Sequence, residues 1–136
     1  MKLWIVYYSL SGNTKRIAEQ IRETLGGDLS EIETIVPYTG DYNAVVAQGE
    51  EEIRRGFMPE IRPFGARTAD YDTVILGTPV WWYTFAPAVK TFLAGNDLAG
   101  KTVYPFATNG GWIGHTFKDI EKACPDATVK KGLNVL

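Results

Sequence analysis

The side chains best suited to chemistry lie in one short stretch, Ser9 to Thr14, whose sequence is Ser-Leu-Ser-Gly-Asn-Thr. No side chain in it is charged, and its polar groups are hydroxyls and one amide. Together with backbone N–H groups at the start of a helix, such groups bind anions, and a phosphate monoester can use many of them at once. The alternative is an ordinary turn in which Ser11, Asn13 or Thr14 caps a helix.

Two other stretches combine residues that suit contact with a flat ring. The first, Thr78 to Thr84, contains two tryptophans and a tyrosine in a row, which cannot all point into a core. The second, Thr108 to His115, is a glycine-rich turn with one aromatic side chain. We expect at least one ring to lie in a crevice beyond the sheet. The alternative for Trp81 and Trp82 is packing beneath the helix that follows them.

The segments around these stretches predict strands and helices in alternation. Residues 2–8 form a strand that is apolar on both faces, and apolar residues at helical spacing predict a helix that ends at Leu25, before two glycines. Further strands are expected over 29–36, 71–77, 102–107 and 127–136, and further helices over 42–55, over 87–95 and from Thr116 to the residue before Pro125.

Three finer expectations concern single positions within these elements. We expect Glu50 to Glu52 to form a solvated helix face, because they are a run of like charges. Thr116 and Asp119 have the spacing of a capping box, and the last strand is expected to bulge at Gly132.

Strands that alternate with helices, without a repeat or a linker, predict an α/β fold. It would be a three-layer sandwich, with a five-stranded parallel sheet between helices and right-handed crossovers. In the strand order 2-1-3-4-5, the three stretches described above follow neighbouring strands, namely the first, third and fourth. Ligands of such sheets lie beyond the carboxyl ends of the strands, so the three stretches would meet in one site.

The composition limits the class of protein. The 136 residues are enough for one domain, residues 1–136. The 14 Lys and Arg nearly balance the 16 Asp and Glu, which argues against nucleic acid or a membrane as partner. Cys124 and His115 are each the only residue of their kind, so neither a disulfide within the chain nor a metal cluster is expected. Because no apolar run approaches about 20 residues and the chain enters its first strand directly, we expect a cytoplasmic protein.

Two motif matches are set aside because of their context. Gly95 to Thr102 fits the phosphate-loop expression G-x-x-x-x-G-K-[ST], but it would follow a helix and open a strand, which is the reverse of a true phosphate loop. The glycines of 110–114 lack the G-x-G-x-x-G spacing of a dinucleotide site. Ser9, Ser11 and Cys124 have no identifiable base partner, so no catalytic residue is predicted.

A phosphate site at one end of a crevice and aromatic rings at the other fit FMN, and on this evidence the sequence resembles the flavodoxin family. The family's phosphate loop reads roughly [ST]-x-[ST]-G-x-[ST] after the first strand, as Ser9 to Thr14 does. Residues 77–82 and 108–111 are similar to the two loops that flank the flavin ring in a short flavodoxin-like subgroup. The resemblance covers nearly the whole chain and implies non-covalent FMN, with its phosphate in the first loop and its isoalloxazine between the other two.

The resemblance also implies roles for individual residues. The hydroxyls and amide of the first loop would hold the phosphate, and Gly12 would let the backbone approach it closely. Trp81 or Trp82 would cover the ring, and Asn109 to Gly111 would offer backbone amides to its polar edge. The full set of expected FMN-binding residues is Ser9, Leu10, Ser11, Gly12, Asn13, Thr14, Thr78, Pro79, Val80, Trp81, Trp82, Thr108, Asn109, Gly110, Gly111 and His115.

Two features differ from the flavodoxin pattern. Flavodoxins continue past strand five into a last helix that shares a sheet face with helix one, and we expect this helix to be absent because the sequence given stops at Leu136. An exposed apolar patch is therefore expected beside the first helix, and either a homodimer contact or a further C-terminal segment would cover such a patch. The strong acidity usual in flavodoxins is also missing, which argues against docking on a basic redox partner.

Together these features predict an FMN-binding electron-transfer protein that serves a redox partner protein or a small electron acceptor. One alternative is an NAD(P)H-dependent quinone or nitro reductase on the same fold, in which Trp112 and His115 would border a substrate pocket. Another is a non-flavin binding module, although no acidic pair follows strand one to form a phosphoacceptor site. Because residues 78–84 contain neither glycine nor a carboxylate, we expect chemistry shifted towards two-electron steps.

Overall fold

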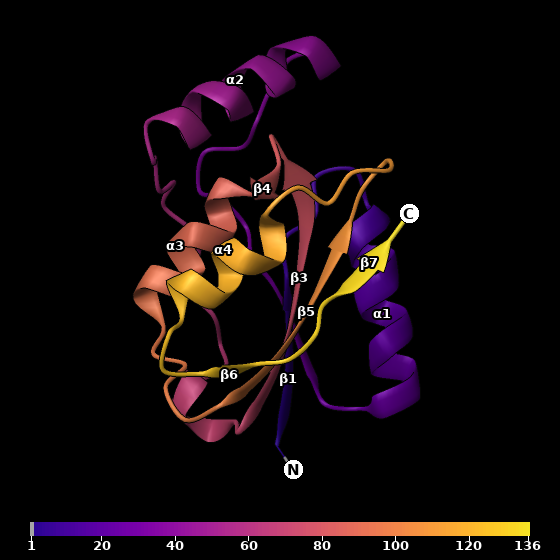
Figure 1. The fold of residues 1–136 in the computed structure, drawn as a ribbon, viewed down its shortest axis with the longest axis vertical. Helices are drawn as coiled ribbons and strands as arrows, with labels where there is room; N and C mark the ends of the chain where they lie inside the picture. The colour runs from indigo at the N-terminus through magenta and orange to yellow at the C-terminus, as the bar shows by residue number, and fades with distance from the viewer. Residues whose placement is uncertain (1) are drawn as a thin grey trace.

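A twisted sheet runs through the molecule, with helices on both of its faces (Figure 1). The structure is a computed structural model, and it describes residues 2–136. Its strands are β1 (Leu3–Tyr7), β2 (Asp28–Glu31), β3 (Thr73–Trp81), β4 (Thr84–Phe85), β5 (Thr102–Thr108), β6 (Thr128–Val129) and β7 (Leu133–Val135). Its helices are α1 (Asn13–Leu25), α2 (Tyr42–Arg54), α3 (Pro87–Gly95) and α4 (Thr116–Ala123), with a 3-10 turn, η1 (Thr68–Asp70).

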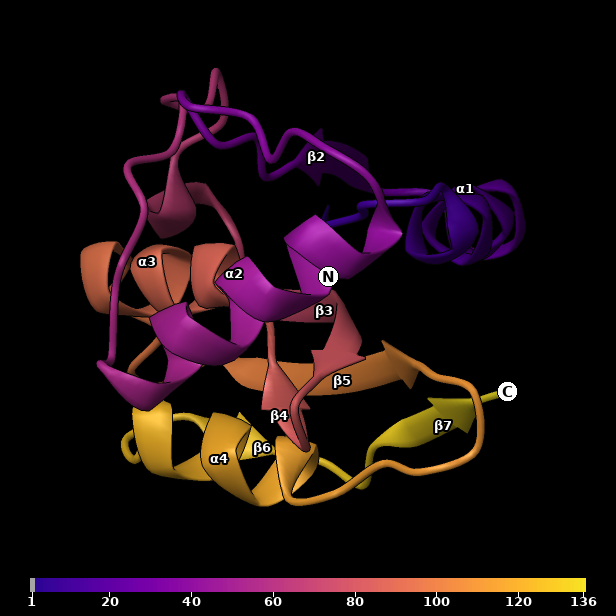
Figure 2. The ribbon, with the colours of Figure 1, turned by 90° about the horizontal axis from the view of Figure 1, so that it is seen from above.

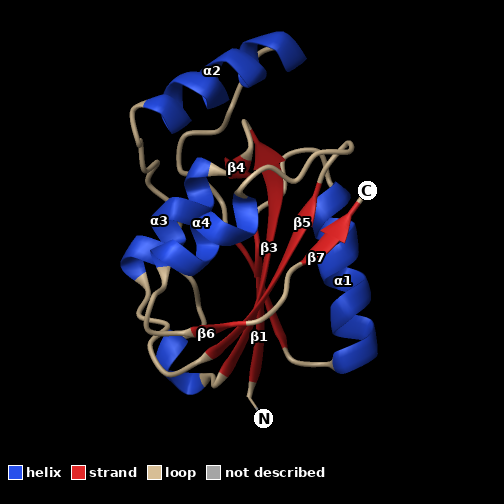
Figure 3. Cartoon of the chain, in the orientation of Figure 1, coloured by secondary structure: helices blue, strands red, loops and turns tan. Residues whose placement is uncertain are grey.

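The strand order is β2-β1-β3-β5, and β6 and β7 then pair with opposite ends of β5. All of these pairings are parallel, while β4 turns back antiparallel on β3. If β6 and β7 are taken as one interrupted strand, this is the predicted order 2-1-3-4-5. Figure 3 shows α3 and α4 on one side of the sheet and α1 on the other, so the predicted three-layer α/β sandwich is confirmed.

The core has one part on each side of the sheet, because every residue of β1 is buried. On the side of α3 and α4, Trp4 is fully buried and stacks on Tyr71, with ring centroids 5.1 Å apart. On the α1 side, Ile5 packs with Ala18 of α1. Burial of both faces is what a near-continuous apolar strand requires, so β1 forms as its sequence predicts.

The α1 side of the sheet is less fully covered than the other. Tyr104 of β5 and Leu133 of β7 both lie on this face, and their side chains are 44% and 57% exposed. Both are exposed apolar side chains on the sheet face where the sequence analysis expects an apolar patch. No helix among the described residues is long and apolar enough to span a membrane.

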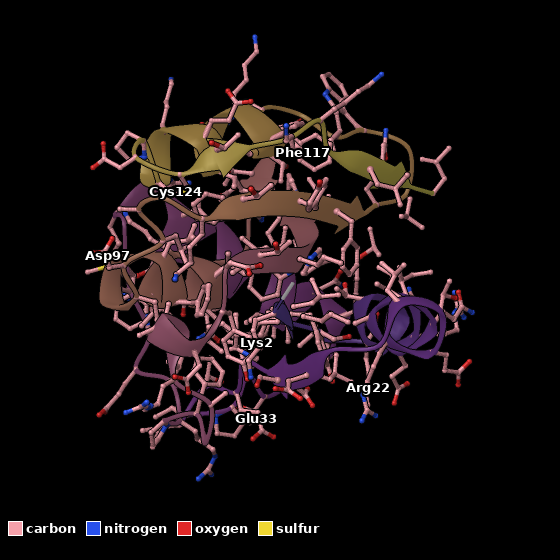
Figure 4. All side chains as sticks on the ribbon, turned by 90° about the horizontal axis from the view of Figure 1, so that it is seen from below. Lys2, Arg22, Glu33, Asp97, Phe117 and Cys124 are labelled. Carbon is pink, nitrogen blue, oxygen red and sulfur yellow. The ribbon has the colours of Figure 1, made fainter. Side chains whose placement is uncertain are left out.

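Several strand boundaries differ from the sequence prediction. The second strand ends at Glu31, five residues early, and only an isolated bridge from Thr34 to Ile61 continues it. The third strand runs four residues further than predicted, to Trp81. The last strand is interrupted between Val129 and Leu133. The ring of Phe117, a residue of α4 (Figure 4), lies against Gly132, 2.5 Å from where a Cβ at Gly132 would be. The predicted bulge is therefore a complete break.

One helix detail was also predicted incorrectly. The capping box of α4 does not form, since Thr116 is already inside the helix and its hydroxyl donates to the carbonyl of Ile113 at 2.7 Å. The Asp119 carboxylate instead contacts Thr84 and His115.

The burial of Glu52 in α2 differs from the sequence prediction. Glu52 was expected on a solvated face, but its side chain is only 4% exposed. Its carboxylate accepts a hydrogen bond from the Tyr38 hydroxyl at 2.6 Å and another from the Gln48 amide at 2.8 Å. A buried carboxylate is tolerated because these donors replace the water that it loses. Glu52 thereby ties α2 to the segment before it, near the carboxyl end of the sheet.

We expect Glu52→Ala to lower the free energy of unfolding by about 1–3 kcal/mol, because it leaves the partly buried Tyr38 hydroxyl without its acceptor. Glu51→Ala is the matched control, since Glu51 is exposed on the same helix and its loss should change stability by about 0.5 kcal/mol or less. Urea denaturation followed by circular dichroism gives both values. Equal effects would show that the buried carboxylate does not stabilise α2.

Candidate functional site

A cavity of about 560 Å³ lies at the end of the sheet where β1, β3 and β5 finish, and α2 passes across this end (Figure 2). Three loops surround it: the turn between β1 and α1, the hairpin between β3 and β4, and the loop after β5. These are the three stretches that the sequence predicts to meet. The wall consists of Leu10, Ser11, Asn13, Thr14, Arg16, Ile17, Tyr42, Val45, Val46, Gly49, Pro79, Val80, Trp81, Trp82, Thr108, Asn109, Gly110, Val135 and Leu136.

The turn between β1 and α1 leaves the start of the helix open towards the cavity. Gly12 adopts a left-handed conformation, with φ of 96°, and its N–H donates to the Ser9 hydroxyl at 3.1 Å. No side chain of the described residues caps α1, and its first turn contains no acidic residue. The first N–H groups of a helix have no partner within it, so this end offers donors and the positive end of the helix dipole.

The hydroxylic residues of this turn have different roles. Ser11 and Asn13 are exposed and line the cavity. Thr14 is almost fully buried, and its hydroxyl is 2.7 Å from that of Thr108, at the end of β5. This hydroxyl pair joins the first loop to the third.

The two tryptophans form the opposite wall. Trp81 packs edge to face against Tyr8 and Tyr38, with ring centroids 5.8 and 5.1 Å away, and against Gly49 of α2. Trp82 is 40% exposed. Both residues line the cavity and contact α2, and Trp81 also packs against the core on the α3 side of the sheet.

The hairpin that carries these rings has an unusual turn. Val80 pairs with Phe85 and Trp81 with Thr84, which leaves two residues in the turn, Trp82 and Tyr83. Both have positive φ, 49° and 71°, as a tight two-residue hairpin requires. For residues other than glycine, this conformation costs about 1–3 kcal/mol each, so surrounding contacts must hold the turn in place.

The loop after β5 is held by Asn109. Its backbone N–H donates to the carbonyl of Val135 at 3.0 Å, and its side-chain amide donates to Asn134. Its side-chain carbonyl accepts from the N–H of Gly111 at 3.0 Å. These bonds fix the loop against β7, so that Gly110 faces the cavity.

Among its described side chains, the cavity wall carries one positive charge and no negative charge. None of the described residues that line it has a carboxylate side chain, and Arg16 carries the one charged side chain. Behind the wall, burial, and secondarily the Glu52 carboxylate, raises the pKa of Tyr8 well above its usual value, so this phenol stays neutral. The wall therefore favours a ligand that carries negative charge near α1 and an apolar ring near the tryptophans.

Most of the residues predicted for the site lie on the cavity wall. Those that do not are Ser9, Gly12, Thr78, Gly111 and His115. Thr78 is fully buried and uses its hydroxyl to accept from the N–H of Ala86 at 3.1 Å. His115 lies at a second, smaller hollow behind the hairpin.

The wall also contains residues that the sequence analysis missed. Arg16 and Ile17 follow the predicted loop directly and lie in the first turns of α1. Their position next to the loop could have predicted that they line the same cavity. The contribution of α2 has its signal in the apolar residues on one face of that helix, a spacing that predicts the helix but does not tell what its face contacts. The missed residues are Arg16, Ile17, Tyr42, Val45, Val46, Gly49, Val135 and Leu136.

Comparison with known proteins agrees with this geometry. A family model described as flavodoxin matches residues 2–135. The chain belongs to the flavodoxin family. No curated protein matches it.

Solved structures extend the flavodoxin assignment. A candidate flavoprotein from Bacteroides eggerthii is 36% identical, with a TM-score of 0.89 over 98% of this chain and 87% of its own. The flavoprotein from Lactobacillus acidophilus, solved in complex with FMN, is 25% identical, with a TM-score of 0.85 over 98% and 91% of the two chains. A flavodoxin from Fusobacterium nucleatum, 16% identical with a TM-score of 0.56 over 95% of this chain and 68% of its own, shares the fold.

Proposed function

We propose that residues 1–136 form a single FMN-binding domain that transfers electrons. One observation carries the proposal. A single cavity joins an uncapped helix start, free of acidic residues, to a wall of two tryptophans. A ligand that uses both ends needs an anionic group and a flat ring, which FMN combines.

The phosphate of FMN fits the α1 end of the cavity. Ser11 and Asn13 present polar side chains there, and the free N–H groups at the start of α1 point outwards from the helix. Arg16 adds a positive charge on the same wall. Thr14 would act through its backbone, because its hydroxyl is already bonded to Thr108.

The ring of FMN fits the tryptophan end. Trp81 is held by the tyrosines and the glycine packed against it, so it offers a fixed surface, and Trp82 lies beside it. Asn109 and Gly110 bring polar groups to the same wall for the edge of the ring. When bound, FMN supplies the redox chemistry, and the chain binds, orients and shields it. The FMN complex of the Lactobacillus acidophilus relative supports this choice of ligand.

The exposure of the tryptophan end of the site supports electron transfer to a partner protein or a small acceptor. Trp82 at the cavity, and Tyr83 and Trp112 near it, are 40%, 48% and 69% exposed, so an acceptor can approach this end. A second candidate function is the NAD(P)H-dependent quinone or nitro reductase. The wall without a carboxylate side chain favours it, because such a wall does not repel the anionic, fully reduced flavin.

The first prediction concerns the phosphate. The purified protein should bind FMN, and Ser11→Asp should weaken this binding at least tenfold, roughly 1.4 kcal/mol, because a carboxylate at the start of α1 repels the dianion. Binding of riboflavin, which lacks the phosphate, should change much less. Gln20→Glu is the matched control, since it adds a charge to the same helix at an exposed position off the cavity wall.

Fluorescence titration with both flavins gives the four comparisons. A wild-type protein that binds neither flavin contradicts the proposed function. An equal loss of FMN and riboflavin in Ser11→Asp shows that the phosphate binds elsewhere.

The second prediction concerns redox tuning. During anaerobic reduction of the FMN complex, absorbance should pass from the oxidised to the fully reduced form through one set of isosbestic points. Val46→Asp, which adds a carboxylate to the wall, should make the potential more negative by on the order of 30 mV, a tenfold change for a two-electron couple. Val46→Asn serves as the uncharged control. Near-complete accumulation of a third absorbing species would contradict the prediction.

A further inference from the structure

The β3–β4 hairpin that carries the two tryptophans is too short to be stable without contacts from other elements. Two residue pairs join β4 to β3, and both turn residues, Trp82 and Tyr83, have positive φ. A short isolated hairpin is only marginally stable, and these side chains disfavour the required conformation. Contacts from other elements must therefore fix the turn.

On the cavity side, one contact comes from α2. The indole N–H of Trp82 donates to the carbonyl of Val46 at 3.0 Å. On the opposite side, the contacts come from the first turn of α4 and the residues just before it, outside the cavity wall.

This second group of contacts is more extensive. The N–H of His115 donates to the carbonyl of Tyr83 at 2.8 Å. The Thr84 hydroxyl donates to Asp119 Oδ2 at 2.6 Å, and the same oxygen contacts His115 Nδ1. Asp119 Oδ2 thus contacts both Thr84, which follows the turn, and His115, whose N–H binds the turn residue Tyr83. The Asp119 side chain is 26% exposed, so water shields this contact only in part.

Gly114 completes the contact surface. Its φ is 60°, and a Cβ at this position would lie 2.4 Å from the carbonyl oxygen of Tyr83 and 2.6 Å from its Cα. Such distances are not possible without displacing backbone, so glycine is required for α4 to approach the turn. Gly114 therefore serves the hairpin, and it does not line the cavity.

We infer that Gly114, His115 and Asp119 are positioning residues for the FMN site: they brace the Trp82–Tyr83 turn from behind and so place Trp81 and Trp82 on the cavity wall. The inference rests on the proposed function for the identity of the ligand. Its structural part, the placement of the two tryptophans, does not. Loss of the brace lets the turn relax to negative φ, which moves both rings away from the wall.

Two single variants test the brace. Asp119→Ala removes the acceptor, and Thr84→Val removes the donor while keeping the shape of the side chain. Each should weaken FMN binding by about tenfold and change the tryptophan signal in the near-ultraviolet circular dichroism of the ligand-free protein. Asp119→Ala removes the Thr84 bond together with the contact to His115, so adding Thr84→Val should cost nothing more, and the double variant should bind FMN about as well as Asp119→Ala alone.

Two controls separate the brace from general stability. Thr84→Ser keeps the hydroxyl and should behave like the wild type. Glu121→Ala removes an exposed carboxylate from the same helix and should change neither readout. If Asp119→Ala fails to fold, the pair Thr84→Val and Thr84→Ser still decides.

The outcomes distinguish the two claims. A wild-type protein that does not bind FMN overturns the proposed function, and the near-ultraviolet signal of the ligand-free variants then tests the brace alone. A signal in Thr84→Val identical to that of Thr84→Ser overturns the inference. Additive losses of FMN affinity in the double variant overturn it as well.

Discussion

The parallel pairing of β1, β3 and β5 is the constraint on which the site depends. Tyr7 pairs with Gly77, and Gly77 with Phe106, so the three strands finish at the same edge of the sheet. Because parallel strands are joined by crossover helices, the chain leaves the sheet at this edge after each strand and returns to it at the opposite edge, so three loops collect here. The apolar cores on both sides fix this pairing, since a strand buried on both faces cannot shift without exposing large side chains.

Much of the fold follows from local sequence. Apolar runs and helical spacing predict the strand β1 and the helix α3 that begins at a proline, and the structure confirms both. The strand order expected for the fold class is confirmed as well. The errors come from tertiary contacts that spacing does not report. Glu52 is buried with Tyr38 and Gln48 as donors to its carboxylate, and the last strand is interrupted next to Gly132, where the Phe117 ring packs.

The site was predicted as far as the loops define it. Their residue types mark an anion end and an aromatic end, and both lie on one cavity. The sequence did not indicate the hairpin, because Trp82 and Tyr83 are poor residues for a turn with positive φ. Nor did it indicate the wall formed by α2, whose apolar stripe has the same spacing whether it faces a core or a cavity. Both features depend on contacts between distant segments.

The central claim is that one cavity holds an anionic group at the start of α1 and a flat ring at Trp81 and Trp82. A crystal structure of the protein grown with FMN tests it most directly. The account predicts the phosphate within hydrogen-bond distance of the backbone N–H groups around Ser11 to Thr14, and the ring against one of the tryptophans. A phosphate bound away from α1, or a ring that contacts neither tryptophan, would contradict it.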